Sequence, residues 1–205
     1  MAVSIRTRRS RPLPKRWAAS FDLTVDRQFE RLRGRPALDR LFYGASALGD
    51  HGLVWLLLGC VRGLRSEGGW KAAIRVGVGV GAESALVNIG IKSLFRRKRP
   101  VWDLERPLRL RRPLTSSFPS GHATSAFTAA ALLSDQDRLR PLYYVVALVV
   151  AWSRVYVRIH HASDVVAGMV IGAGLGRLGR KLFPLPPAGE LLPPPRESQP
   201  RESQH

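Results

Sequence analysis

Apolar segments of helical length, separated by basic or turn-forming stretches, constrain the fold of this chain more than any other feature. Five such segments follow one another, at Leu41–Val61, Ala72–Phe95, Ala123–Ser134, Tyr143–Val157 and Val165–Leu182. They are rich in Ala, Val, Leu, Ile and Gly, and most contain or adjoin a few polar side chains. Segments of this kind predict helices, so the sequence indicates an all-α fold.

The sequence indicates less directly whether these helices lie in water or in a lipid bilayer. No segment is the uninterrupted run of about 20 apolar residues expected of a simple membrane span, so a soluble helical bundle is an alternative. Small residues recur four positions apart in two stripes, Gly168–Gly172–Gly176 and Gly77–Gly81–Ala85. Such stripes let helices approach closely in lipid, whereas each helix-interior glycine costs about 1 kcal/mol in water. We therefore expect a membrane-embedded helical bundle of about five spanning helices, in a multi-pass protein of the cell membrane.

The segment Ser20–Arg33 is amphipathic. Its apolar side chains Phe21, Val25, Phe29 and Leu32 fall on one side at helical spacing, and charged residues supply most of the remainder. A surface helix on a soluble domain would show the same pattern. Beside an apolar bundle, the pattern favours an N-terminal helix that lies in the membrane interface.

Composition divides the chain into three parts. Residues 1–19 predict a disordered basic tail, and residues 184–205, dominated by Pro, Glu, Ser and Gln, predict a disordered Pro-rich tail. Residues 20–183 would then form one helical domain. The single cysteine, Cys60, excludes an intrachain disulfide and is expected to be buried in its apolar run.

The formal net charge of +18 indicates anionic partners, such as nucleic acid, an anionic membrane surface or a phosphorylated substrate. The positive charge is concentrated in residues 1–40 and in Arg96–Arg112, with apolar blocks between them. A uniformly basic nucleic-acid binder does not usually show such blocks. We therefore expect membrane lipids and a phosphorylated substrate as partners, and no nucleic acid.

Lys92 and Arg99 form the first pair of residues suited to a phosphate. Lys92 is expected on the last turn of a helix that ends near Phe95, and Pro100 turns the chain at Arg99. Two cations of different reach can then converge on one anion. Taken alone, the basic run around them also fits a solvated charge run, a lipid-headgroup patch or a nucleic-acid patch.

The second stretch is the turn Pro119–His122, which is followed at once by a helix of small residues. Backbone N–H groups at such a helix start bind anions readily, and the Ser120 hydroxyl adds a donor. His122 would stand at the entrance of the site. A capped helix with a surface histidine is the alternative interpretation.

The third stretch runs from Ser153 to Asp164. Arg154 lies near the end of one apolar segment, and Asp164 follows His160 by four residues. At that spacing the carboxylate can accept a hydrogen bond from one imidazole nitrogen and leave the other nitrogen basic, as in the pairs that activate nucleophiles. A metal site of His160, His161 and Asp164 is an alternative, but adjacent histidines point in different directions, and we expect neither a metal nor a cofactor.

Together the three stretches resemble the tripartite signature of the type 2 phosphatidic acid phosphatase (PAP2) superfamily, which includes vanadium haloperoxidases. The pattern is K-x6-RP, then PSGH, then SR-x5-H-x3-D, and every fixed position is filled. The resemblance covers the helical region from about residue 40 to residue 183. It implies a six-helix α-bundle with the site at one end of the helices, and metal-independent hydrolysis of a phosphoester through a phosphohistidine.

The resemblance also implies a role for each residue. By position, His160 resembles the nucleophile, Asp164 its orienting carboxylate, and His122 the acid that protonates the leaving oxygen and then activates water. The implied phosphate cradle consists of Lys92, Arg99, Ser120, the Gly121 N–H and Arg154.

Some positions depart from the family pattern. Arg158, His161 and Ala162 stand around the nucleophile where many members have Gly, an aromatic residue and Pro. These departures bear on the substrate pocket. The usual first spanning helix is also absent, with the amphipathic segment Ser20–Arg33 in its place.

We expect a membrane phosphatase that acts on a lipid phosphate or diphosphate, of the phosphatidate or polyprenyl-phosphate type. One alternative is a vanadate-dependent haloperoxidase, although the expected larger soluble domain and halide-site residues are not apparent. Another is a non-catalytic basic membrane protein with the same fold. The positive-inside rule favours an active site at the cytoplasmic face, whereas the resemblance to the family leaves an outward-facing site open.

Overall fold

The structure, a computed structural model, describes residues 13–65, 69–100, 110 and 115–186. All regular structure in these ranges is helical. The helices are α1 (Leu13–Glu30), α2 (Pro36–Leu48), α3 (Leu53–Arg65), α4 (Gly69–Ala85), α5 (Gly121–Leu133), α6 (Arg140–Tyr156) and α7 (Ala162–Leu182). Two short helical turns, Leu86–Gly90 and Ile91–Leu94, extend α4. The predicted all-α fold is confirmed.

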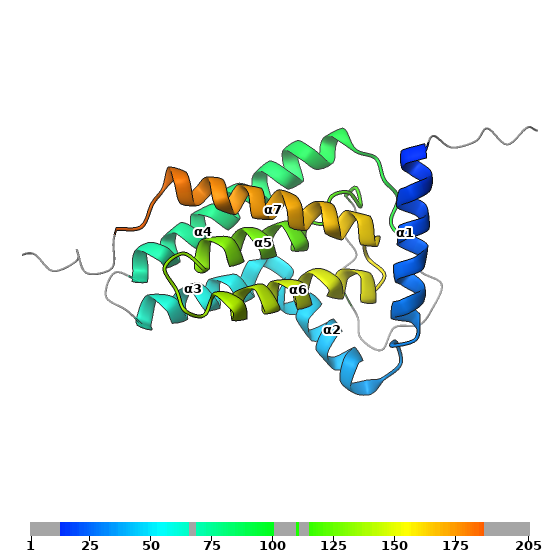
Figure 1. Ribbon diagram of the computed structural model, residues 1–205, viewed down its shortest axis with the longest axis horizontal. Coiled ribbons are helices and arrows are strands. Elements are labelled where there is room, and N and C mark those ends of the chain that lie inside the picture. The colour runs from blue at the N-terminus through cyan, green and yellow to red at the C-terminus, as the bar shows by residue number, and fades with distance from the viewer. Residues whose placement is uncertain (1–12, 66–68, 101–109, 111–114, 187–205) are drawn as a thin grey trace, which may run out of the picture.

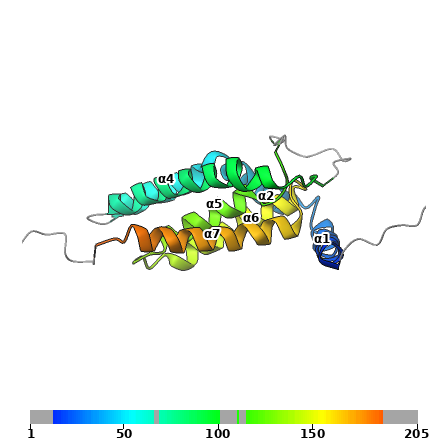
Figure 2. The same cartoon turned by 90° about the horizontal axis from the view of Figure 1, so that it is seen from above.

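Helix α5 lies at the centre of the bundle. It contacts α3, α4, α6 and α7, and Figure 2 shows it between α4 on one face and α6 and α7 on the other. Its sequence explains this position, because α5 carries small and apolar side chains on all of its faces. A helix of this kind is buried. Ser120 caps the N-terminus by accepting a hydrogen bond from the Ala123 N–H over 3.5 Å.

Four helix ends meet at one end of the bundle, beside α1 (Figure 1). They are the extended C-terminus of α4, the N-terminus of α5, the C-terminus of α6 and the N-terminus of α7. Helix α1 runs across this end and packs against α6 and α7. Phe29 of α1 lies against Trp152 of α6, with ring centroids 6.0 Å apart. The segments that carry the predicted site residues therefore converge.

Three glycines of α7 let this helix lie almost against the backbone of α5. A Cβ on Gly172 would stand 2.2 Å from the Thr124 carbonyl oxygen, and the nearest distances for Gly168 and Gly176 are 2.7 and 2.5 Å. This predicted stripe is therefore a close helix contact. The second stripe behaves differently, since a Cβ on Gly81 would meet nothing within 4 Å.

Two elements begin or break at unexpected positions. The segment Leu41–Val61 is divided into α2 and α3, which are bent by 78° at the turn Asp50–Gly52. Gly52 has a φ of 72°, which glycine adopts without steric cost, so the turn can change the direction of the helical path. Helix α1 begins at Leu13 rather than Ser20, so residues 13–19, expected in the basic tail, are helical. The predicted tail beyond residue 186 lies outside the described residues.

Large apolar side chains face outward along much of the bundle. Cys60, expected to be buried, is exposed on α3, on the same outer face as Leu57 and Val61. By length and apolar composition, one helical run among the described residues could cross a membrane, Gly69–Leu94. The bent pair α2 and α3 would add a second if it formed one broken span.

The α5–α7 contact leads to a test of the packing. We expect Gly172→Ala to destabilise the protein by about 1–3 kcal/mol, because the added methyl group would collide with a backbone carbonyl that cannot rotate away. The matched control is Gly174→Ala on the same helix, where a Cβ would meet nothing within 4 Å. That variant should be at least as stable as the wild type, since alanine favours helix. Thermal unfolding in detergent compares the two, and equal stability would contradict the close contact.

Candidate active site

His160 lies in the connection between α6 and α7, with 3% of its surface exposed. Its Nδ1 is 2.8 Å from the carbonyl oxygen of Ser117. A carbonyl oxygen only accepts hydrogen bonds, so this contact assigns the proton to Nδ1 and the lone pair to Nε2. Nε2 in turn lies 3.1 Å from Nη1 of Arg99. The basic nitrogen of the expected nucleophile therefore faces one of the expected phosphate-binding cations.

Asp164 supports this histidine less directly than the spacing suggested. Its Oδ2 lies 3.8 Å from Nδ1 of His160, beyond hydrogen-bonding distance. The same oxygen accepts hydrogen bonds from the Ser117 hydroxyl at 2.5 Å and from the His161 N–H at 3.0 Å. Ser117 thus links the two residues, because its carbonyl accepts the imidazole proton while its hydroxyl donates to the carboxylate.

The other oxygen of Asp164 has a partner that the sequence analysis did not single out. Nη1 of Arg97 donates to Oδ1 of Asp164 at 2.5 Å, and Nη2 of Arg97 donates to Asp22 of α1 at 2.6 Å. Arg97 lies between Lys92 and Arg99 in a basic run. No local feature of the sequence distinguishes one arginine of this run from the next. Only the tertiary contacts identify it.

Lys92 reaches the N-terminus of α5. A Cβ on Gly121 would stand 3.4 Å from Nζ of Lys92, so the ammonium group lies against the first turn of the helix. Asn88 holds that group by accepting a hydrogen bond at 2.7 Å. A cation and a helix N-terminus together form an anion-binding position. Ser120 is fully buried beside it and is the N-cap of α5.

Arg99 and Arg154 bring guanidinium groups to the two histidines. Nη1 of Arg99 donates to the Ile159 carbonyl at 3.1 Å, which ties the loop after α4 to the turn that carries the nucleophile. Arg154 is 2% exposed and donates to the hydroxyl of Ser46 on α2. The C-terminus of α6 is thereby joined to the helix before the bend.

His122, the expected acid and base, packs against the bend between α2 and α3. Its Nε2 lies 3.0 Å from Oδ1 of Asp50, and a Cβ on Gly49 would stand 2.7 Å from its ring. Burial and the nearby charge of Arg154 lower the pKa of His122 to about 4, and the Asp50 carboxylate opposes them by favouring the protonated form, which is the form that can donate a proton. The sequence analysis missed this role of Asp50, although a carboxylate that interrupts an apolar run was the available signal.

Two of the departures from the family pattern, Arg158 and His161, contact different segments. Arg158 has a φ of 54°, a left-handed conformation that favours glycine, the residue of many family members. Its guanidinium group is hydrogen-bonded to Glu30 of α1. His161 is the N-cap of α7, and its side chain is within 3.3 Å of the Lys98 carbonyl.

The arrangement as a whole is typical of phosphoryl transfer to a histidine. A neutral imidazole nitrogen faces fixed cations and a helix N-terminus, and a second histidine stands beside a carboxylate. Among the described residues, no group of three His, Cys, Asp or Glu side chains is placed to hold a metal ion.

Comparison with known proteins agrees with a site for phosphoryl transfer. The sequence matches the PAP2 superfamily over residues 72–185. It is 36% identical to a decaprenylphosphoryl-5-phosphoribose phosphatase of Mycobacterium tuberculosis, over 70% of this chain and 80% of the relative. The structure superposes on LpxE of Aquifex aeolicus with a TM-score of 0.62 and 30% identity, covering 78% of this chain and 94% of LpxE.

A second solved structure shares the fold. The transmembrane PAP2-type phosphatidylglycerolphosphate phosphatase of Bacillus subtilis superposes with a TM-score of 0.55 and 22% identity, over 80% of this chain and 89% of the other. The chain therefore belongs to the PAP2 superfamily. The expected class of enzyme, a hydrolase of lipid phosphates, is confirmed.

The burial of His160 leads to a prediction on pH. Burial lowers the pKa of His160 to about 3, with the charges of Arg154 and Arg99 acting in the same direction and Asp164 opposing them. The unfolded chain, with an ordinary pKa near 6.5, binds a proton that the folded protein excludes. The contribution of His160 to the free energy of unfolding is therefore fully present above its pKa in the unfolded chain. It is lost as the pH falls toward its pKa in the folded protein.

We expect the melting temperature of the wild type in detergent to fall more steeply between pH 6.5 and pH 4 than that of His160→Asn. The variant has no group that titrates at this position. Parallel curves for the two proteins would show that His160 is not buried in its neutral form.

Proposed function

We propose that the protein is a multi-pass membrane phosphatase that hydrolyses the phosphoester of a polyprenyl-linked phosphate through a phosphohistidine at His160. The observation that carries this proposal is the state of that imidazole. Its Nδ1 proton is held by a backbone carbonyl at 2.8 Å, and its Nε2 faces Arg99 at 3.1 Å. A lone pair aimed at a cationic anion site can attack phosphorus without first losing a proton.

The reaction follows in two steps. Nε2 of His160 attacks phosphorus, the bond to the lipid oxygen breaks, and His122 gives its proton to that oxygen. His122 then takes a proton from water, whose oxygen attacks the phosphohistidine, and inorganic phosphate leaves as His160 regains its lone pair. Lys92, Arg99, Arg154 and the first N–H groups of α5 stabilise the charge on the phosphoryl oxygens, which is the main demand of such transfers.

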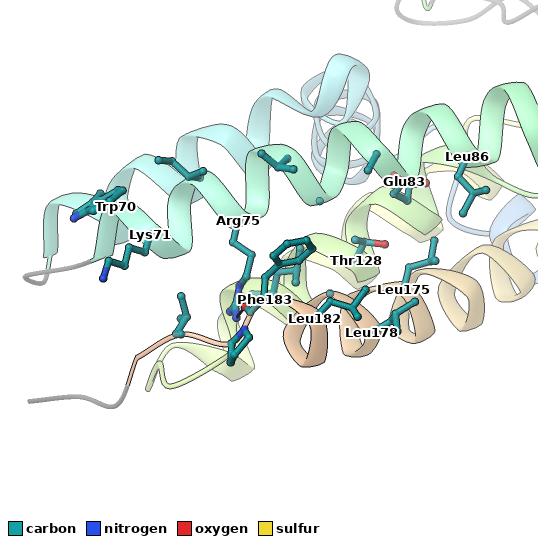
Figure 3. A pocket seen from close by; sticks show the side chains of 18 of the residues that line it. Trp70, Lys71, Arg75, Glu83, Leu86, Thr128, Leu175, Leu178, Leu182 and Phe183 are labelled. Atoms are coloured by element: carbon teal, nitrogen blue, oxygen red, sulfur yellow. Dashed lines mark hydrogen bonds between the residues drawn. The ribbon is translucent and has the colours of Figure 1, made fainter. Parts of the chain in front are cut away.

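An apolar cavity supports a substrate with a long hydrocarbon chain. It has a volume of about 510 Å³ and lies between α4, α5 and α7. Figure 3 shows Leu175 and Leu178 of α7 on the opposite side of this space from α4. Leu86, at one end of the cavity, precedes Lys92 by under two helical turns. A chain in this cavity could therefore extend toward a phosphate bound at Lys92.

The membrane placement rests on the outward-facing apolar surface and on the relatives. Leu57, Ile89 and Val170 are each more than half exposed, although all three are large apolar residues. One matched structure is a transmembrane phosphatase. A surface of this kind is stable against lipid and unfavourable against water. The polyprenyl class is the more specific part of the proposal and is supported by the substrate named for the mycobacterial relative.

The covalent step is tested with p-nitrophenyl phosphate, whose leaving group needs no protonation. We expect His122→Ala to accumulate an acid-labile phosphohistidine, because without the base the second step is slowed while the first continues. His160→Ala should insert in the membrane, form no phosphoenzyme and release no phosphate. Two quantities are measured together: the acid-labile phosphate bound to the intact protein and the inorganic phosphate released into solution.

The same assay separates the alternatives. Full phosphate release by His160→Ala would refute the assigned nucleophile. Oxidation of bromide by the vanadate-loaded wild type with hydrogen peroxide, in the absence of any phosphatase activity, would favour the haloperoxidase. A wild type that neither forms phosphoenzyme nor releases phosphate from lipid substrates would favour a non-catalytic protein.

The cavity gives a second test. We expect Leu178→Trp to lower kcat/KM for a long polyprenyl monophosphate by about tenfold or more, since a filled apolar pocket rejects a chain it would otherwise bind. Activity on p-nitrophenyl phosphate should be unchanged. Val170→Trp is the control, because Val170 is exposed on the same helix and does not line the cavity. Equal effects of the two variants on the lipid would remove the cavity from the proposal.

A further inference from the structure

Asp164 is a fully buried carboxylate, with no exposed surface. A charge in that position is stable only when partners replace the water that it loses. The Ser117 hydroxyl and the His161 N–H supply two hydrogen bonds to one oxygen. The other oxygen is held by Arg97, whose Nη1 is 2.5 Å away. Arg97 is therefore the cation that balances Asp164.

Arg97 is itself fixed by α1. Its Nη2 is 2.6 Å from Oδ2 of Asp22, whose side chain is 9% exposed. Asp22 also accepts hydrogen bonds from the Ser163 N–H at 2.8 Å and the Ser163 hydroxyl at 3.1 Å, in the first turn of α7. One guanidinium group thus bridges two carboxylates, and the second of them joins α1 to the helix that carries Asp164.

We propose that Asp22 and Arg97 are positioning residues for phosphoryl transfer, so that α1 completes the catalytic site. The inference rests on the proposed function, in which His160 is the nucleophile. Arg97 fixes the rotation of the Asp164 carboxylate, the carboxylate fixes the Ser117 hydroxyl, and the Ser117 carbonyl fixes the proton of His160. Loss of the bridge lets this chain of contacts rotate and leaves the attacking lone pair less well aimed.

The backbone supports the same chain of contacts. The Ser117 N–H donates to the Arg97 carbonyl at 2.9 Å, and the Arg97 N–H donates to the Ser116 hydroxyl at 3.2 Å. The segment after α4 is therefore paired with the segment before α5 at the residue that contacts the histidine. Movement of Arg97 would be transmitted to Ser117 by both its main chain and its side chain.

Helix α1 stands outside the region matched to the superfamily, residues 72–185. Phe21 and Leu23, on either side of Asp22, are 43% and 59% exposed. An amphipathic helix with such residues is suited to the membrane interface. Arg158, where many family members have Gly, adds an ion pair to Glu30 of the same helix. The departure from the family pattern thus serves to seat α1 on the catalytic end of the bundle.

The test uses the full chain in detergent with p-nitrophenyl phosphate and a polyprenyl monophosphate. We expect Asp22→Asn to lower kcat about ten- to a hundredfold, by analogy with the outer partners that orient metal-binding imidazoles, with KM nearly unchanged. Asp26→Asn, one turn further along α1, is the control, because Asp26 pairs with Arg33 and Arg158, whereas Arg97 pairs with Asp22 and Asp164. It should retain wild-type kcat.

Two further measurements separate positioning from folding. In Arg97→Gln, protonation of Asp164 is no longer opposed by a guanidinium group, so the acid limb of kcat should move to higher pH. The charged groups facing Asp164 are Arg97 and, at 3.8 Å, His160 when protonated. Arg97→Lys keeps the charge and should restore the position of the acid limb, but it cannot bridge two carboxylates as a planar guanidinium does.

A double-mutant cycle completes the design. If Asp22 acts through Arg97, the double variant Asp22→Asn/Arg97→Gln should have the same kcat as Arg97→Gln alone. Multiplied effects, or wild-type kcat and acid limb in Asp22→Asn, would overturn the inference. That result is distinct from failure of the proposed function, which would appear as phosphate release by His160→Ala.

Discussion

The close contact between α5 and α7 is the constraint on which the site depends. Because Gly168 and Gly172 carry no Cβ, the first turns of both helices lie side by side, and the Ser120 N–H donates to the Asp164 carbonyl at 3.1 Å. This hydrogen bond joins the turn of the second motif to the backbone of the residue that carries the carboxylate of the third. A wider spacing between the helices would separate Lys92 and the α5 N-terminus from His160.

The sequence predicts which residues come together at one end of the bundle better than it predicts which residues support them. His160, His122, Lys92 and Arg99 could be selected because their motifs have short fixed spacings at helix ends, and the structure brings these helix ends together. Asp22, in contrast, acts across 75 residues through Arg97. A contact of that range leaves no periodic signal, so it emerges only when the helices are assembled.

The two stripes of small residues show the same limit. Both have a spacing of four, and in lipid both are suited to close helix contact. The stripe on α7 faces the backbone of α5, whereas Gly81 on α4 faces open space among the described residues. The spacing indicates that one face of a helix carries only small residues. Which element packs against that face depends on the tertiary fold. For the same reason, Asp50 stands in the sequence only as a carboxylate that interrupts an apolar run, and its contact with His122 emerges from the tertiary fold.

The distribution of charge across the site has a physical logic. A carboxylate close to the bound phosphate would repel it, yet both histidines need carboxylates to control their protons. The fold meets both requirements on opposite sides of the His160 ring. Nδ1 is connected to Asp164 through Ser117, whereas Nε2 faces Arg99. Arg97 then confines the charge of Asp164 to the side away from Nε2. In the proposed mechanism for this chain of net charge +18, the cations would bind the substrate, and Asp164 and Asp50 would determine where the two histidines hold their protons.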